Sequence, residues 1–392
     1  MNAPEHTGLP ARQDAAGTLS GEIHAFHYAT RQPVRVRWAD RRIVEVASVA
    51  DKPQKELWLA PPLVDLQING YAGVDFQQDN LTADDLFLAA RALRRDGCAY
   101  FLLTLITDEW ARLITRLKHL RQLRESSPEL RGAIIGWHIE GPFLSDKPGY
   151  CGAHNPAVMR DPKPEDIREL RAASGADRVL ITMAPERTGA VEAIQLATSL
   201  GLRVSLGHTD ADAQTLQRAV RAGATGFTHL ANGCARELDR HDNILWRVCD
   251  TPGLTVSFIP DGIHVPARVF RLLHKLLDGP VYYTTDAMAA AGAGPGNYRL
   301  GGLELEVGVD QIVRQPGKTN LAGSALRPID AVFRAAKMLN CPWQECWRKI
   351  SEVPARFVGF ENDLRVETRS FCVVDPGAAS VTIFPGYSDC QN

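Results

Sequence analysis

The chain has almost no net charge, no paired cysteine motif and no long apolar run. Its 392 residues include 44 Lys and Arg against 46 Asp and Glu, which gives a formal net charge of −2. Proteins that bind nucleic acid or anionic membranes through charge carry a basic surface, and this composition provides none. We therefore expect a small-molecule partner, with no nucleic acid and no membrane.

The cysteines and the apolar segments exclude two further classes of protein. Eight cysteines are scattered along the chain without a C-x-x-C pair, a pattern that fits neither a zinc ribbon nor a secreted disulfide scaffold. No segment approaches the roughly 20 apolar residues needed to cross a bilayer, and the N-terminus lacks the apolar core of a signal peptide. We expect a soluble, cytoplasmic protein with reduced thiols.

Strand-like and helix-like patterns alternate through the middle of the chain. The strand-like runs are PLVDLQI, AYFLLTL, AIIGWHI, RVLITMA, LRVSLG, ATGFTHL, LTVSFIP and VYYTTDA. Helical patterns lie at 82–96, 108–125, 188–200, 211–222, 266–277 and about 325–357. This alternation predicts an α/β fold, a (β/α)₈ TIM-like barrel. An open doubly wound sheet is the second choice, but no G-x-G-x-x-G follows the first strand.

Short alternating segments at both ends of the chain predict a small β-sandwich built from both termini. They include GEIHAFHY and RIVEVA near the start and SVTIF near the end. We expect residues 1–18 to be a mobile tail, 19–60 and 359–392 to form the small domain, and 61–358 to form the barrel.

Polar side chains follow the predicted barrel strands. In chain order they are Gln67, Asn69, Glu140, His208, His229, His264 and Asp286. The carboxyl ends of barrel strands converge on one face, so these side chains can meet. A catalytic zinc site uses three protein ligands and leaves a position open for water, and His and carboxylate ligands suit it. Glu140, His208 and His229 are the candidate ligands, although each histidine alone could be a hydrogen-bonded structural residue.

Other features of the sequence carry less information. PGKTN lacks the preceding glycine of a P-loop, and AGSAL lacks the flanking glycine of a nucleophile elbow. His138 shares a strand face with Glu140, and we expect it to support a ligand or to pack in the core. The glycine-rich stretch 289–302 is either a flexible loop over the site or an ordinary surface loop.

Seven segments in order resemble the motifs of one enzyme family. They are GWHIEGPFL, GAHNP, SLGHTDA, THLANG, PDGIHV, TTDAMAAAG and LAGSAL. The chain resembles the N-acetylglucosamine-6-phosphate deacetylases of the amidohydrolase superfamily, whose small β-rich domain would match the two ends. The resemblance implies metal-dependent hydrolysis of N-acetylglucosamine 6-phosphate to glucosamine 6-phosphate and acetate in amino-sugar catabolism.

The resemblance also implies a metal count. Glu140, His208 and His229 would hold one divalent metal per subunit, with Zn²⁺ as the first choice. Many amidohydrolases hold a second metal with H-x-H at the end of the first strand, whereas Gln67 and Asn69 stand there in this chain. Neutral amides are weaker zinc ligands than imidazole, so we expect them to orient water or neighbouring ligands.

By the same resemblance, Asp286 is the general base that becomes the general acid, and His154 polarises the acetyl carbonyl. The substrate-binding residues implied are His154, Asn232, Gly233, Arg240 and His264. Arg240 would reach across from the second subunit of a homodimer, although Arg236 lies close enough in the sequence to compete.

The chain departs from the family where the loop after THL contacts the substrate. Ala231 replaces an aromatic residue and Gly233-Cys234 replaces Ala-Met. The identity of the sugar therefore stays open, and N-acetylgalactosamine 6-phosphate or another N-acyl amino sugar is the alternative substrate. A non-catalytic sugar-phosphate binding protein is a third interpretation, and the presence of all four candidate ligand and base residues argues against it.

Overall fold

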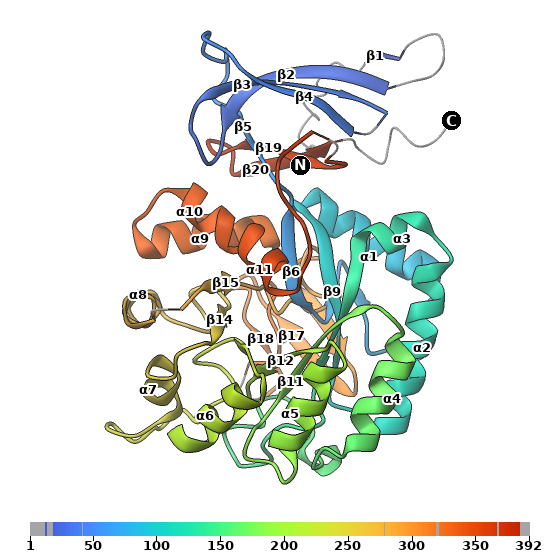
Figure 1. Cartoon of the computed structure of the whole chain (residues 1–392), viewed down its shortest axis with the longest axis vertical. Helices are drawn as coiled ribbons and strands as arrows, with labels where there is room; N and C mark the ends of the chain where they lie inside the picture. Colours follow the sequence, from blue (N-terminus) through green and yellow to red (C-terminus); the bar gives the residue numbers. More distant parts are fainter. Residues whose placement is uncertain are drawn as a thin grey trace.

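The central sheet consists of eight parallel strands. A computed structural model describes residues 12–13, 19–40, 42–277, 279–318, 321–366 and 368–384 (Figure 1). The strands are β6 (Leu63–Ile68), β9 (Cys98–Ile106), β10 (Ile134–Glu140), β11 (Arg178–Met183), β12 (Arg203–Leu206), β13 (Gly226–Phe227), β14 (Thr255–Phe258) and β15 (Val281–Tyr283). They pair in sequence order from β6 to β15, and each overlaps one of the eight predicted runs. The predicted barrel is confirmed.

Helices follow most of the strands. The predicted ones are α1 (Ala83–Arg95), α2 (Trp110–Glu125), α5 (Ala190–Ser199), α6 (Ala213–Ala222), α8 (Ala267–Leu276), α9 (Pro328–Leu339), α10 (Trp343–Lys349) and α11 (Glu352–Phe357). Four further elements lie outside the predicted helical segments: α3 (Pro128–Ala133), α4 (Pro164–Ser174), α7 (Ile244–Cys249) and the 3₁₀ turn η1 (Pro156–Val158). Helix α1 shows the local cause of such a segment: Thr82 and Asp85 form a capping box, and Leu86 and Leu93 lie on its buried face.

A buried carboxyl group helps to close the barrel between its first and last strands. Asp65 of β6 accepts hydrogen bonds from the Thr284 hydroxyl and from the backbone N–H of Thr285, at 2.9 Å, just beyond β15. The backbone N–H of Asn69 donates to the carbonyl of Ala287 at 2.7 Å. These bonds join the ends of β6 and β15, which form no ladder with each other. The closure brings the residues after the two strands together.

Strands from both ends of the chain form one seven-stranded sheet. Its order is β20 (Ser380–Phe384), β19 (Phe371–Asp375), β5 (Trp58–Ala60), β2 (Leu19–His27), β3 (Pro33–Ala39) and β4 (Arg42–Ser48), with β1 (Arg12–Gln13) also paired to β2. The ring centroids of Trp38 on β3 and Phe371 on β19 lie 5.7 Å apart. A flat sheet would separate these strands by about 14 Å. The sheet therefore folds back on its own core, as expected for a sandwich-like domain from both termini (Figure 1).

Part of the glycine-rich stretch after β15 is regular. Residues 296–300 form β16 (Gly296–Leu300), which pairs with β17 (Leu303–Val307), and β18 (Val313–Arg314) completes a three-stranded sheet. The prediction of a loop throughout 289–302 was wrong for this part. Alternating apolar residues explain the strands, because Leu300, Leu305 and Val307 pack in a core with Met288. A two-residue hairpin, β7 (Gly70–Tyr71) and β8 (Val74–Asp75), follows β6.

The predicted tail and the predicted domain boundaries both stay predictions. The mobile tail predicted for residues 1–18 lies outside the described residues, except for Arg12–Gln13, and so does 385–392 of the C-terminal part. Among the residues that the structure describes, no helix combines the length and the apolar character that a membrane span requires.

We predict that Asp65→Asn lowers the free energy of unfolding by about 1–3 kcal/mol, because an amide nitrogen facing a backbone N–H leaves a buried donor without an acceptor. Urea denaturation would measure the change. Asp84→Asn, on the exposed side of α1, is the control and should stay within about 0.5 kcal/mol of wild type. An Asp65→Asn protein as stable as the control would show that this carboxyl group does not help to close the barrel.

Candidate active site

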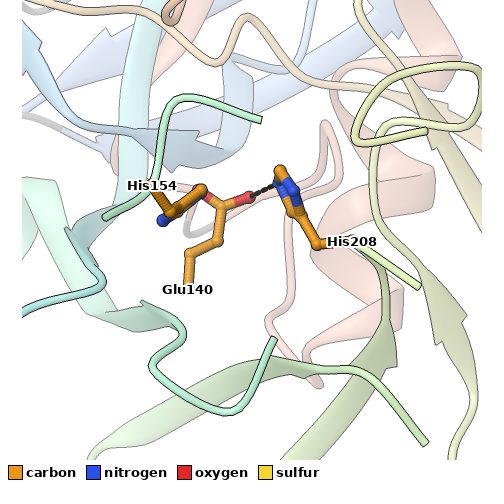
Figure 2. Close-up of side chains that lie close together, drawn as sticks. All are labelled: Glu140, His154 and His208. Carbon is orange, nitrogen blue, oxygen red and sulfur yellow. Dashed lines mark ion pairs between the residues drawn. The ribbon is translucent and has the colours of Figure 1, made fainter. Parts of the chain in front are cut away.

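Three histidines surround one buried carboxylate at the carboxyl end of the barrel. Glu140 ends β10, and its Oε1 lies 2.9 Å from Nε2 of His229 and 3.5 Å from Nε2 of His208. Its Oε2 lies 3.7 Å from Nε2 of His154, which comes from the loop after β10. Figure 2 shows His154 and His208 on either side of the Glu140 carboxylate. Candidates that are far apart in sequence therefore meet at one point.

The backbone turns sharply where these side chains enter the site. His208, His229 and Asp286 have φ angles of 50°, 32° and 52°, in the left-handed region that residues other than glycine rarely adopt. Such conformations cost about 1–3 kcal/mol each and persist only where the surroundings enforce them. Each of the three residues lies shortly after a barrel strand. Strained backbone at three strand ends is typical of a site built for function.

The hydrogen bonds of His208 leave one of its ring nitrogens facing the carboxylate. Nδ1 lies 2.9 Å from the carbonyl oxygen of Tyr150, and because a carbonyl can only accept, Nδ1 carries the proton. In neutral imidazole, Nε2 then presents a lone pair to Oε1 of Glu140. Two acceptors that face each other at 3.5 Å favour a cation between them. The donor set thus fits a divalent metal.

Two glycines hold the ring of His208 in place. A Cβ on Gly152 would lie 2.9 Å from Cε1 of that ring, and a Cβ on Gly233 would lie 2.7 Å from Nδ1. Both glycines also have positive φ, at 59° and 57°. Any larger residue would push the imidazole away from Glu140. Gly233 was predicted to bind substrate. Its close approach to the ring of His208 also leaves no room for a side chain at this position.

The third metal ligand is not fixed by distance alone. The ligand atoms of Glu140, His154 and His208 lie within 4.8 Å of one another and could hold a metal ion. His229, which was predicted as the third ligand, contacts Glu140 at 2.9 Å, and its Nδ1 has no hydrogen-bond partner in the described part of the chain. Both sets share Glu140 and His208. The choice of His229 stays a prediction.

The two amides at the end of β6 bond to the two carboxylates of the site. Gln67 donates from Nε2 to Oε1 of Glu140 at 2.8 Å, and Asn69 donates from Nδ2 to Oδ1 of Asp286 at 2.6 Å. Residues two apart on a strand share a face, which lets both side chains reach the site. The expectation that they orient neighbouring groups agrees with these contacts.

Burial and neighbouring charges shift the pKa values of the site. Burial alone would raise the pKa of the Glu140 carboxyl, but the adjacent His208 and His229 hold that pKa well below its usual range. Burial, together with the charge of Glu140, raises the pKa of Asp286 to about 7. Burial, and then the nearby His208, lowers the pKa of His154 to about 3. His154 is therefore neutral near pH 7.

A cavity of about 440 Å³ opens over these residues. Its wall includes Asn232, Gly233 and His264, as predicted for substrate binding, and also Arg236. His264 bonds through Nδ1 to Oδ2 of Asp261 at 2.6 Å, which leaves Nε2 for a ligand. Arg240 does not line the cavity of its own chain. A role for Arg240 in a neighbouring subunit stays a prediction.

Some residues that contact the site were not predicted from the sequence. Sequence reasoning gave no role to the Tyr150 carbonyl, to Gly152 or to Asp261, and only the nearby GAHNP and PDGIHV motifs could have pointed to them. His138 is buried, with its ring nitrogens 3.0 Å from the Leu66 carbonyl and 2.8 Å from the Thr182 hydroxyl. It packs in the core behind the site, one of the two roles expected for it.

Known proteins of similar sequence share one activity. The chain is 30% identical over 307 residues to the N-acetylglucosamine-6-phosphate deacetylase of Vibrio furnissii, covering 78% of this chain and 75% of the relative. It is 33% identical over 313 residues to the enzyme of the same name from Bos taurus, covering 77% and 75%. No protein-family model matches the chain.

A solved structure extends the similarity to the fold. A variant of N-acetyl-D-glucosamine-6-phosphate deacetylase from Mycobacterium smegmatis, in complex with N-acetyl-D-glucosamine-6-phosphate, superposes with a TM-score of 0.82 at 30% identity. The match covers 92% of this chain and 96% of the other. Barrel and small domain are therefore both shared.

We predict that wild-type protein retains about one divalent metal per chain after dialysis. The double substitution Gln67→His and Asn69→His should raise the metal content toward two per chain, because imidazoles replace weakly donating amides on the same strand face. Elemental analysis of the dialysed proteins would measure it. A wild-type protein that already holds two metals, both needed for activity, would show that the amides do not set the count.

Proposed function

Because the chain belongs to the N-acetylglucosamine-6-phosphate deacetylase family of the amidohydrolase superfamily, we propose that it hydrolyses N-acetylglucosamine 6-phosphate to glucosamine 6-phosphate and acetate in amino-sugar catabolism. The observation that carries the proposal is the meeting of Glu140, His208, His229 and Asp286 at the floor of one cavity. A carboxylate with imidazoles and a second carboxylate nearby suit metal-assisted hydrolysis of an amide, in which the metal activates water and the second carboxylate moves the proton.

Glu140, His208 and His229 would hold the metal. His154 lies close enough to Glu140 and His208 to be the third ligand in place of His229. When bound, a divalent metal lowers the pKa of its water and polarises the carbonyl of the amide. Imidazole and carboxylate ligands in a site with three protein donors suit Zn²⁺, our proposed metal. The hydrogen bond from Gln67 to Oε1 of Glu140 restrains the orientation of that carboxylate.

Asp286 moves the proton in this proposal. Its carboxylate accepts a proton from the attacking water and then delivers it to the departing nitrogen, because an amide anion is a very poor leaving group. Asn69 holds Oδ1 by a 2.6 Å hydrogen bond, which leaves Oδ2 for the water. The same bond restrains rotation of the carboxyl group, so that one oxygen stays aimed at the cavity.

His154 binds the carbonyl oxygen of the acetyl group. The ring is neutral near pH 7, and its Nδ1 is a buried atom without a hydrogen-bond partner in the described residues. A neutral imidazole can donate one N–H, and a developing oxyanion strengthens that bond as the reaction proceeds. His154 therefore both orients the substrate and lowers the barrier.

The phosphate of the substrate binds at the other wall of the cavity. Asn232 and Gly233 bring donors from the loop after β13, and His264 brings a ring nitrogen. A guanidinium would complete the site, because it matches phosphate geometry in a bidentate manner. Arg240 of a homodimeric neighbour is our first choice, and Arg236 of the same chain, which lines the cavity, is the alternative.

Two features of the chain support further parts of the proposal. Small residues at Ala231 and Gly233 widen the cavity, so N-acetylgalactosamine 6-phosphate or another N-acyl amino sugar is the second candidate substrate. The seven cysteines in the described residues are all unpaired, which fits the reducing cytoplasm that we propose. A role in binding alone is the weaker interpretation, because ligands and base all lie at one site.

We predict that metal-replete wild-type protein releases acetate from N-acetylglucosamine 6-phosphate, with lower rates on N-acetylgalactosamine 6-phosphate and on unphosphorylated N-acetylglucosamine. Asp286→Asn should retain the metal but lose about 10²–10⁴-fold in kcat, because an amide cannot accept the proton. An acetate-release assay beside elemental analysis measures both. No acetate from any of the sugars, or an active Asp286→Asn protein, would refute the proposed reaction or the proposed base.

We predict that Arg240→Ala raises KM for the phosphorylated sugar at least tenfold and that mixing it with Asp286→Asn restores activity. In a mixed dimer, one site would have both its own Asp286 and the partner's arginine, so random re-association should recover about a quarter of wild-type activity. Arg236→Ala with Asp286→Asn is the matched pair. Recovery in neither mixture, together with the larger KM effect at Arg236, would place the phosphate arginine in the same chain.

A further inference from the structure

A second, larger cavity lies beside the candidate active site and shares part of its wall. Its volume is about 980 Å³, against about 440 Å³ for the cavity over the metal site. The two cavities share the wall residues Ile106, Gly152, Ala153, His154 and Leu300. His154 is the residue that we place at the acyl carbonyl. The space beyond the acyl group is therefore a groove. A pocket built only for acetate would instead end in a closed wall of methyl size.

The wall of the groove changes from apolar to polar along its length. Ile106, Ala153 and Leu300 form an apolar neck at the junction, and Ile106 and Ala153 pack against the core that contains Leu300. Beyond the neck, the wall carries side-chain amides, namely those of Gln77, Gln78, Asn80, Asn155 and Gln315. A ligand that fits both parts has apolar carbons first and a polar group further out.

Four charged residues in the wall of the groove, Asp79, Asp108, Arg112 and Arg116, pair with one another. Arg116 lies 2.7 Å from Asp79 and 3.0 Å from Asp108, and Arg112 lies 2.6 Å from Asp79. The Arg116 side chain is only 1% exposed, and its Nη1 is a buried donor without a partner in the described residues. That donor is shielded from the groove, so the side-chain amides offer the polar contacts to a ligand.

The tip of the β16–β17 hairpin forms one side of the groove. The backbone N–H of Gly301 donates to Oδ2 of Asp75 at 2.9 Å, which ties the tip to the hairpin that follows β6. Gly302 lines the groove, and a Cβ built on it would meet no atom within 4 Å. The groove is thus bounded by an anchored wall that leaves open space in front of Gly302.

We propose that this chain hydrolyses amino-sugar phosphates whose N-acyl group is longer than acetyl, with a chain of about four to six atoms that ends in a hydroxyl or amide. The inference rests on the proposed function, because the phosphate at Arg236 or the partner's arginine directs the acyl group toward His154 and the groove. Water adds OH to the acyl carbon, the C–N bond breaks and the nitrogen gains a proton. The products are a carboxylate and the free amino sugar phosphate.

The acyl carbons gain binding free energy by contact with the apolar neck, and the polar end gains hydrogen bonds in the groove. Each methylene that leaves water is worth up to about fourfold in binding. A polar end that reaches the amides replaces hydrogen bonds to water. An acetyl group reaches neither part. The groove therefore selects for a longer acyl chain in a way that the site around Glu140 does not.

The test compares N-acetyl-, N-butyryl- and N-(4-hydroxybutyryl)-glucosamine 6-phosphate as substrates, with release of the free amine as the measurement. We expect kcat/KM to rise at least fivefold from acetyl to 4-hydroxybutyryl. Gly302→Trp should fill the groove, keep kcat/KM for the acetyl substrate within twofold and reduce that for 4-hydroxybutyryl at least tenfold. Val309→Trp is the matched control, because Val309 is 92% exposed and follows the same hairpin outside both cavities.

The outcomes separate this inference from the proposed function. Hydrolysis of the acetyl substrate with a loss of tenfold or more on lengthening would overturn the groove and leave the deacetylase intact. Hydrolysis of the longer substrates alone would support the groove and refute acetyl as the natural group. Equal effects of Gly302→Trp and Val309→Trp on 4-hydroxybutyryl would also overturn the inference. If Gly302→Trp abolishes hydrolysis of the acetyl substrate, Gly302→Leu takes its place in the test. The measurement is then the kcat/KM for the 4-hydroxybutyryl substrate divided by that for the acetyl substrate.

Discussion

The carboxylate of Glu140 is the constraint on which the site depends. It is buried at the end of β10, where an unpaired negative charge would cost several kcal/mol. Gln67 donates one hydrogen bond to it, and the ring nitrogens of His154, His208 and His229 all lie within 3.7 Å. These groups come from four different places in the sequence, so the charge is stable only when the barrel has closed around it. Fold and site are therefore specified together.

The sequence predicted the barrel well because buried parallel strands are short apolar runs with regular spacing. It also predicted that Glu140, His208, His229 and Asp286 lie together, because each follows such a run. Asp65 was missed as a group that closes the barrel, since a carboxyl inside an apolar run has no period of its own. The Tyr150 carbonyl could not be found from residue type, because every residue has one. The contacts that matter there are set by the path of the loop.

The parts of the site that the sequence did not predict lie on loops, where spacing in sequence says little about distance in space. Arg236 and Arg240 are four residues apart, yet only Arg236 lines the cavity of its own chain. The strands β16 and β17 were hidden by glycines at 292, 294, 296, 301 and 302. Their alternating apolar residues become informative only against the core that they cover, and that core includes Met288, two residues after Asp286.

The closure of the barrel at β6 and β15 gives the catalytic machinery a particular weak point. Asn69 and Asp286, which bond to each other at 2.6 Å, lie on opposite sides of the junction that Asp65 holds together. A local opening there would separate the base from its orienting amide while β9 to β14 stayed paired. The enzyme could then lose turnover by a small, reversible fluctuation well below its global unfolding free energy. Thermal inactivation would precede thermal denaturation, and a ligand that bridges the two strand ends would delay the first more than the second.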